Sequence, residues 1–68
     1  MKILDSVALR RDFPEQGLPA GLVGVVVEEW QEGIFEVEFA DLEGRTYAFA
    51  AIAGEDLLPL HHSLERAA

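Results

Sequence analysis

The sequence predicts an all-β fold: a small five-stranded antiparallel barrel in a single domain, residues 1–60, followed by a short helical or disordered tail, residues 61–68. The first observation behind this prediction is the spacing of glycine and proline: 6 glycines and 3 prolines divide the 68 residues into short segments. The second is that these segments are rich in β-branched and aromatic residues, which suit a pleated strand. The third is that 50% of the residues are hydrophobic, which is enough for one core.

The first predicted strand, residues 6–9, is a short apolar segment that ends at a pair of arginines. Residues 12–21 then form a loop, because its two prolines lack backbone donors and disfavour helical geometry in the residues before them. Phe13 and Leu18 in this loop have two interpretations: they form a lid over the core, or they line a groove for a ligand.

Residues 22–30 are β-branched and aromatic, and predict a second strand. Gly24 inside it indicates a bulge or a close approach of another backbone. A hairpin turn follows at residues 31–33, and Gly33 is expected to carry the positive φ of that turn.

Residues 34–40 give the clearest pattern in the chain, because Phe35, Val37 and Phe39 alternate with Glu36 and Glu38. A period of two buries the three large side chains and places the two carboxylates in water. A slip of one residue would invert the two faces, so the register of this strand is expected to be fixed.

A turn at residues 41–44 leads to a fourth strand, 45–51, with Tyr47, Phe49 and Ala51 expected on one face. Residues 55–56 fit a single helical turn. The fifth strand, 57–60, contains a proline and is therefore expected at an edge.

Five short antiparallel strands bury little as a flat sheet, so the sequence predicts a sheet curled into a closed tube. The long first loop, the tight middle turns and the helical turn before the last strand match the plan of an SH3-like barrel. The positions of Val23 and Val26 stay open, because the valine run fills both faces of its strand. The expected core consists of Val7, Leu9, Val25, Val27, Phe35, Val37, Phe39, Tyr47, Phe49, Ile52 and Leu57.

The chain is acidic, with 13 acidic and 5 basic side chains and a formal net charge of −8. No lysine or arginine lies between Arg11 and Arg45. This charge distribution disfavours phosphate backbones, so nucleic acid is an unlikely partner. Two interpretations remain: a solvated acidic surface, or a face complementary to a basic protein. The carboxylates of this gap are Asp12, Glu15, Glu28, Glu29, Glu32, Glu36, Glu38, Asp41 and Glu43.

No group of residues predicts catalysis, a metal site or a cofactor site, and we expect a protein that is not an enzyme. His61 and His62 are adjacent near the C-terminus, where solvated side chains are the rule, and His61 with Glu65 would supply only two metal ligands. The N-terminus lacks the apolar segment of a secretion signal, and no window reaches the length of a membrane span, so we expect a cytoplasmic protein without a membrane partner.

The expected function is therefore recognition of another protein. Trp30 lies at the end of a strand beside acidic residues, and tryptophan is enriched among binding hot spots. The alternative is that Trp30 caps the barrel or packs on Tyr47. The candidate partner-binding residues are Glu28, Trp30, Glu32, Glu36, Glu38, Phe13 and Leu18.

Four segments together resemble a family of small bacterial proteins, domain-of-unknown-function family 4926. They are residues 19–28, 33–41, 44–47 and 57–60, and the resemblance spans residues 3–60. Members of this family look like partners of toxin-like proteins encoded nearby, which implies an antitoxin or immunity role. The family has no established activity and implies no catalytic residues.

A weaker resemblance is to the KOW-type modules of ribosomal proteins and transcription factors, carried by the string Gly-Leu-Val-Gly-Val-Val-Val at residues 21–27. Such modules bind RNA or protein with basic residues around this hairpin, whereas this hairpin is acidic. A nucleic-acid module using Arg10, Arg11 and Arg45 stays an alternative, as do an accessory subunit of an enzyme complex and self-association into a homo-oligomer.

Overall fold

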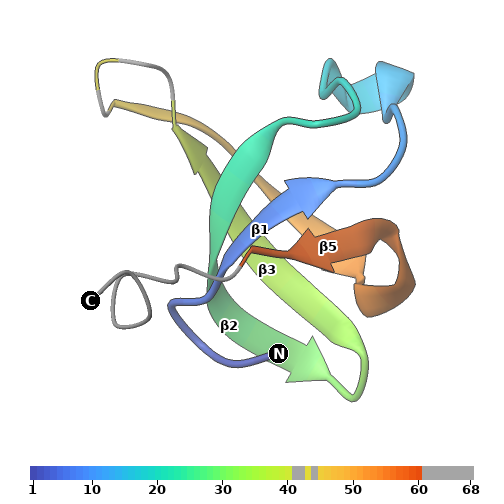
Figure 1. Ribbon diagram of the computed structural model, residues 1–68, viewed down its shortest axis with the longest axis vertical. Coiled ribbons are helices and arrows are strands. Elements are labelled where there is room, and N and C mark those ends of the chain that lie inside the picture. The colour runs from blue at the N-terminus through green and yellow to red at the C-terminus, as the bar shows by residue number, and fades with distance from the viewer. Residues whose placement is uncertain (41–42, 44, 61–68) are drawn as a thin grey trace, which may run out of the picture.

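The structure is a computed structural model, and it describes residues 1–40, 43 and 45–60, with the backbone alone described at Tyr47. Five antiparallel strands form one sheet with the order β4-β3-β2-β1-β5 (Figure 1). The all-β, five-stranded antiparallel fold is therefore confirmed. The elements are β1 (Ser6–Leu9), η1 (Pro14–Gln16), β2 (Val23–Gln31), β3 (Ile34–Ala40), β4 (Thr46–Ala53), η2 (Gly54–Asp56) and β5 (Leu57–Pro59).

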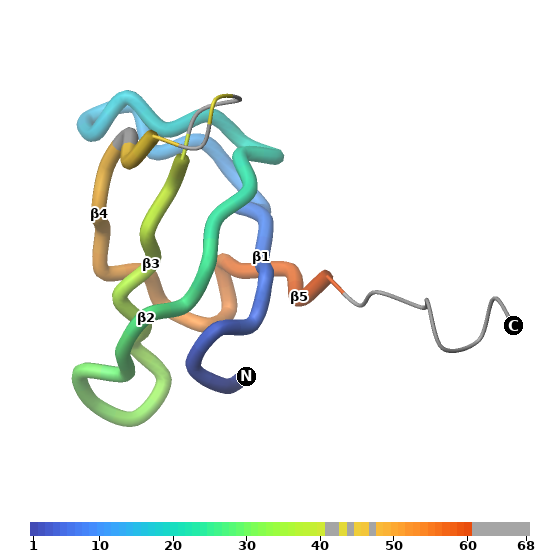
Figure 2. Tube along the Cα trace, turned by 90° about the vertical axis from the view of Figure 1, so that its left-hand side faces the viewer, coloured from blue at the N-terminus to red at the C-terminus, as the bar shows by residue number. Residues whose placement is uncertain are grey.

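The expected closure of the sheet into a tube is wrong, because the sheet is open. β4 pairs with β3 and β5 pairs with β1, and the two outer strands do not pair with each other. The tube trace shows β4 on one side of the molecule and β5 on another (Figure 2). One physical reason is the length of β5, since a strand of three residues that contains Pro59 offers little backbone for a second partner. The five-stranded sheet remains compatible with an SH3-like arrangement.

Two single-turn 3₁₀ helices lie between strands, η1 between β1 and β2 and η2 between β4 and β5. The turn η2 confirms the helical turn expected before the last strand. The turn η1 was not predicted from the sequence, and it begins at Pro14, whose fixed φ suits a first helical position. The tail, residues 61–68, and most of the turn at 41–44 lie outside the described residues.

The core lies on one face of the curved sheet. The alternation predicted for β3 is confirmed, since Phe35, Val37 and Phe39 are all buried. Across the ladder from them, β4 contributes the smaller Ala48 and Ala50, so large side chains of β3 meet small ones of β4. The buried hydrophobic residues are Val7, Ala8, Leu9, Phe13, Leu18, Val26, Phe35, Val37, Phe39, Ala50, Ile52 and Leu57.

The phase predicted for β2 is wrong. Val26 is fully buried, while Val25 and Val27 are only half-buried. Val26 lies opposite Val37 of β3 and therefore shares its inward face. Val25 lies opposite Glu38 and shares the outward face.

The phase predicted for β4 is also wrong, because Phe49 lies outside the core with 56% of its surface exposed. The inward positions are held by Ala50 and Ile52. The core assignment of Tyr47 falls on a side chain outside the described set.

Gly24 confirms the close approach predicted at this position. A Cβ atom built there would lie 2.7 Å from Cδ1 of Phe39, 2.7 Å from Cγ1 of Val37 and 2.8 Å from the carbonyl oxygen of Glu38. β3 therefore packs against bare backbone, which only glycine allows. Gly33 has a φ of 85°, as expected for the β2–β3 turn.

Among the residues that the structure describes, no helix is long and apolar enough to cross a membrane.

Candidate functional site

The outward face of β2, β3 and β4 carries both acidic and aromatic side chains. Glu38 lies between Val25 of β2 and Phe49 of β4, and the next outward row of the sheet places Glu36 between Glu28 and Ala51. We call this surface the acidic-aromatic face and define it by Glu28, Trp30, Glu36, Glu38 and Phe49.

Two carboxylates of this face lie directly opposite each other. The register pairs Glu28 of β2 with Glu36 of β3, just after a β-bulge that shifts the pairing in β2. Like charges at opposite positions destabilise a sheet. In the described residues, neither carboxylate forms an ion pair that would offset this repulsion. A cation from outside the chain would therefore be attracted to this point.

Trp30 belongs to the same face, because its Nε1–H donates to Oε1 of Glu36 at 2.8 Å. The side chain is 60% exposed, so the indole does not lie inside the core. The exposed indole therefore lies beside the carboxylates of the hairpin. Its alternative contact with Tyr47 involves a side chain outside the described set.

Glu38 of this face and Glu29 of the same hairpin both accept hydrogen bonds within the chain. Glu38 accepts a hydrogen bond from the hydroxyl of Thr46 across the β3–β4 ladder. Glu29 accepts from the backbone N–H of Gly33 at 3.2 Å, which closes the β2–β3 turn. Glu32 is exposed within that turn.

Phe13 and Leu18 are not available to a partner, because both are buried in the core. They pair across the loop in an isolated β-bridge and pack with the buried residues of the sheet. The lid interpretation therefore agrees with the structure, and we remove both residues from the candidate surface. The reason is burial in the core: Leu18 is 2% and Phe13 6% exposed.

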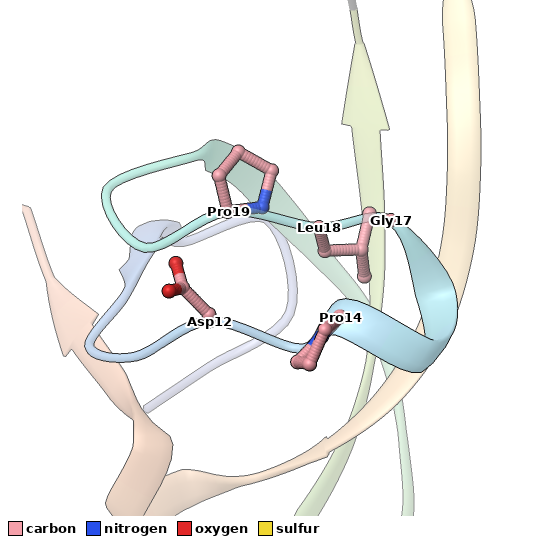
Figure 3. Close-up of a pocket in the computed structure, with 5 residues that line it drawn as sticks. All are labelled: Asp12, Pro14, Gly17, Leu18 and Pro19. Carbon is pink, nitrogen blue, oxygen red and sulfur yellow. The ribbon is translucent and has the colours of Figure 1, made fainter.

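The same loop bounds an open depression of about 520 Å³, lined by Asp12, Pro14, Gly17, Leu18 and Pro19 (Figure 3). Its one charged group is already engaged, since Oδ1 of Asp12 accepts from the backbone N–H of Ala20 at 2.7 Å. The depression therefore presents mainly apolar ring surface and offers no described polar group in need of a partner.

The arginines of the alternative nucleic-acid module are engaged within the chain. Arg11 pairs with Asp56 at 3.2 Å and also stacks on the ring of Phe13 at 4.1 Å. Arg45 pairs with Glu43 at 2.7 Å. Nε of Arg10 donates to a backbone carbonyl of β5. Each of the three arginines thus has a partner within the chain.

Sequence reasoning did not assign Phe49 to this face. A signal was present in the small residues that alternate with it, since Ala48 and Ala50 fit beneath the large side chains of β3. Among the described residues, no cluster of His, Cys, Asp or Glu has the arrangement of a metal site. The histidines considered for metal binding lie outside the described residues.

The fold places the chain in a class of small all-β proteins built on one open antiparallel sheet. The family model described as a domain of unknown function, DUF4926, matches residues 3–59. The chain therefore belongs to the DUF4926 family, as the resemblance of its segments indicated. No curated protein and no solved structure matches the chain.

Proposed function

We propose that this protein is a non-enzymatic binding module that docks a basic protein on its acidic-aromatic face. The observation that supports this most directly is the facing pair Glu28 and Glu36, which repel each other while no described cation neutralises them. A basic partner would relieve this repulsion on binding. The resemblance discussed above favours a toxin-like partner encoded nearby, and hence an antitoxin or immunity role.

The two kinds of side chain on this face have separable roles. Carboxylates raise the rate of association with a basic protein by long-range attraction, which salt screens. Exposed aromatic side chains supply affinity when they become buried, and here Trp30 and Phe49 are 60% and 56% exposed. The proposed action is occlusion, in which the module covers the cationic surface that the partner needs for its own activity.

The experiment is co-expression with the neighbouring gene product, followed by kinetic binding measurements on the purified pair. We expect the double variant Glu28→Gln/Glu38→Gln to lower the association rate about 3- to 10-fold at low salt. The matched control is Glu15→Gln/Glu55→Gln, which removes the same charge from the exposed 3₁₀ turns. The control is expected to change the association rate less than about twofold, because its charges lie outside the acidic-aromatic face and salt screens their attraction for the partner.

A second variant tests the aromatic contribution. We expect Trp30→Ala to weaken binding about 30-fold or more through faster dissociation. Equal association rates for the two double variants would contradict a role of this face in attracting the partner. An unchanged dissociation rate for Trp30→Ala would contradict the placement of the contact.

A further inference from the structure

The edge of β4 differs from the edge of β5 in its free hydrogen-bonding groups. In an antiparallel ladder, pairs that exchange two hydrogen bonds alternate with pairs that exchange none, so one bonded pair fixes the rest. The N–H of Gly54 donates to the carbonyl of Gly33 at 2.8 Å, one step beyond the end of the β3–β4 register. Counting back from Gly54 as far as the register shift, Ile52, Ala50 and Ala48 bond to β3, and Phe49 and Ala51 point their N–H and C=O groups to the open edge.

In the described part of the chain, the outward N–H and C=O groups of Phe49 and Ala51 have no hydrogen-bond partner. The described edge is interrupted only near its N-terminal end, where the register with β3 shifts between Ala48 and Thr46. The eight residues of β4, Thr-Tyr-Ala-Phe-Ala-Ala-Ile-Ala, include no charge, proline or glycine. A long uncharged edge of this kind is a template for another strand.

The edge of β5 is blocked at its two outward positions, Leu57 and Pro59, where another strand would have to form hydrogen bonds. The N–H of Leu60 donates to the carbonyl of Ser6, so the ladder turns Pro59 toward the outside, where it has no N–H to offer. The outward carbonyl of Leu57 accepts from Nε of Arg10 at 3.1 Å. One edge of the sheet is therefore protected and the other is left open.

From this contrast we propose that β4 is a docking edge for an extended segment of the basic partner, which adds to the sheet as a sixth strand beside Phe49 and Ala51. The inference rests on the proposed function and deepens it by naming the mode of binding. The added backbone would satisfy the outward N–H and C=O groups of these two residues.

Charge complementarity identifies what the added strand carries. Ala51 is exposed and small, and it lies directly between the open edge and Glu36. Strands in a sheet are about 4.8 Å apart, so a residue opposite Ala51 on an added strand has its Cα about 10 Å from that of Glu36. A lysine or arginine there can extend over the methyl group of Ala51 to the carboxylate. Trp30, bonded to Glu36, adds an aromatic surface that also attracts a cation.

A second copy of this chain is the less suitable occupant. Each copy carries a formal charge of −8. An antiparallel pair centred on Ala51 would put both Glu36 side chains in one row, with no cation between them. Pairing of two copies around the neighbouring outward residue, Phe49, would not remove this repulsion, because Phe49 lies between the open edge and Glu38.

The test uses the full ¹⁵N-labelled chain and the blocked peptide Thr-Val-Ser-Val-Lys-Val-Ser-Val-Thr as the probe. We expect the amide protons of Phe49 and Ala51 to exchange about tenfold or more slowly when the peptide is bound, because they become hydrogen-bonded. Replacing the peptide's lysine by glutamate is expected to weaken binding about 5- to 10-fold. Fast exchange at both amides under saturating peptide, no binding, or equal binding of the two peptides would overturn the proposal.

Two variants complete the experiment. Ala51→Pro removes an N–H that β3 does not use and is expected to abolish peptide binding. Ala51→Lys keeps the backbone N–H and supplies a cation to Glu36 from within the chain, so the preference for the lysine peptide is expected to disappear. This variant keeps the test decisive if Ala51→Pro does not fold. Sedimentation of the chain alone is the remaining arm: a dimer with both amides protected would make a second copy the occupant and refute the basic segment.

This result is separable from that of the proposed function. The peptide does not depend on the neighbouring gene product, so protection of Phe49 and Ala51 can be observed even if that product does not bind. Conversely, if the face variants slow association with the product while Ala51→Pro binds it as well as the unaltered chain, the proposed function stands and the strand addition is refuted.

Discussion

The contact between β2 and β3 at Gly24 predicts a large loss of stability for the smallest possible substitution, Gly24→Ala. The added Cβ would meet two side-chain carbons of Phe39 and Val37 at 2.7 Å and the carbonyl oxygen of Glu38 at 2.8 Å. The side chains can rotate only into a filled core, and the carbonyl belongs to the neighbouring strand. β2 and β3 must therefore separate locally.

The magnitude follows from two opposing terms. Overpacking of a core costs about 1–3 kcal/mol, and the contact with backbone places this site near the upper end, at about 3 kcal/mol. Alanine also restricts the unfolded chain relative to glycine, which returns about 0.5–1 kcal/mol. The net loss of about 2 kcal/mol is a large part of the stability of a chain of this size, which is about 3–10 kcal/mol.

Thermal unfolding followed by circular dichroism measures this loss directly, and we expect Tm to fall by about 8–16 °C. The matched control is Gly54→Ala, because a Cβ there meets its nearest atom, Cε2 of Phe35, at 3.1 Å, and that ring edge can shift. The control is expected to stay within about 1 kcal/mol of the unaltered chain. A fall in Tm for Gly24→Ala no larger than that for Gly54→Ala would show that the strands accommodate the methyl group, and would refute this reasoning.

Three further predictions concern the core, the surface and a turn. In urea unfolding, Phe39→Ala is expected to lower the free energy of unfolding by about 3–5 kcal/mol because the ring is fully buried. Phe49→Ala on the outer face should lower it by no more than about 0.5 kcal/mol. Similar losses for the two variants would contradict the assignment of inward and outward faces. Asp56→Asn breaks the exposed pair with Arg11 and should cost at most about 1 kcal/mol, and this difference should shrink in high salt, so a salt-independent loss would point to another cause. Gly33→Ala places a side chain at a φ of 85° and should lower the unfolding free energy by about 1 kcal/mol. Gly33→Asn should lose less, because asparagine tolerates positive φ better. Equal stability of the two variants would contradict this explanation.

The parts of the fold that could be predicted from sequence are those with a single readable period. β3 has one apolar and one acidic face, so Phe35, Val37 and Phe39 were assigned to the core correctly. β2 has valines at successive positions, and hydrophobicity alone cannot distinguish its two faces. Its phase is decided by tertiary contact, since Gly24 must lie against Phe39 and this sends Val26 inward.

The acidic residues and Trp30 of the candidate face could be proposed from the sequence, whereas Phe49 could not. Glu36 and Glu38 face outward as their alternation indicated, and the structure adds that Glu36 lies opposite Glu28 across a register shift in β2. Phe49 was misassigned because a large aromatic residue is expected inside a core. Its exclusion follows from the register, since Ala48 and Ala50 lie opposite the buried Phe39 and Val37, while Phe49 lies opposite the outward Glu38.

The unequal edges of the sheet limit the size of any assembly built by strand addition. A chain with two open edges can join head to tail without end and form a fibre, whereas here Pro59 and the Arg10 contact close one side. Two copies joined through β4 therefore have only the protected β5 edges on the outside, and such a pair cannot grow further by strand addition. The stoichiometry of such a complex is thus set by the backbone of the sheet: one strand for each chain.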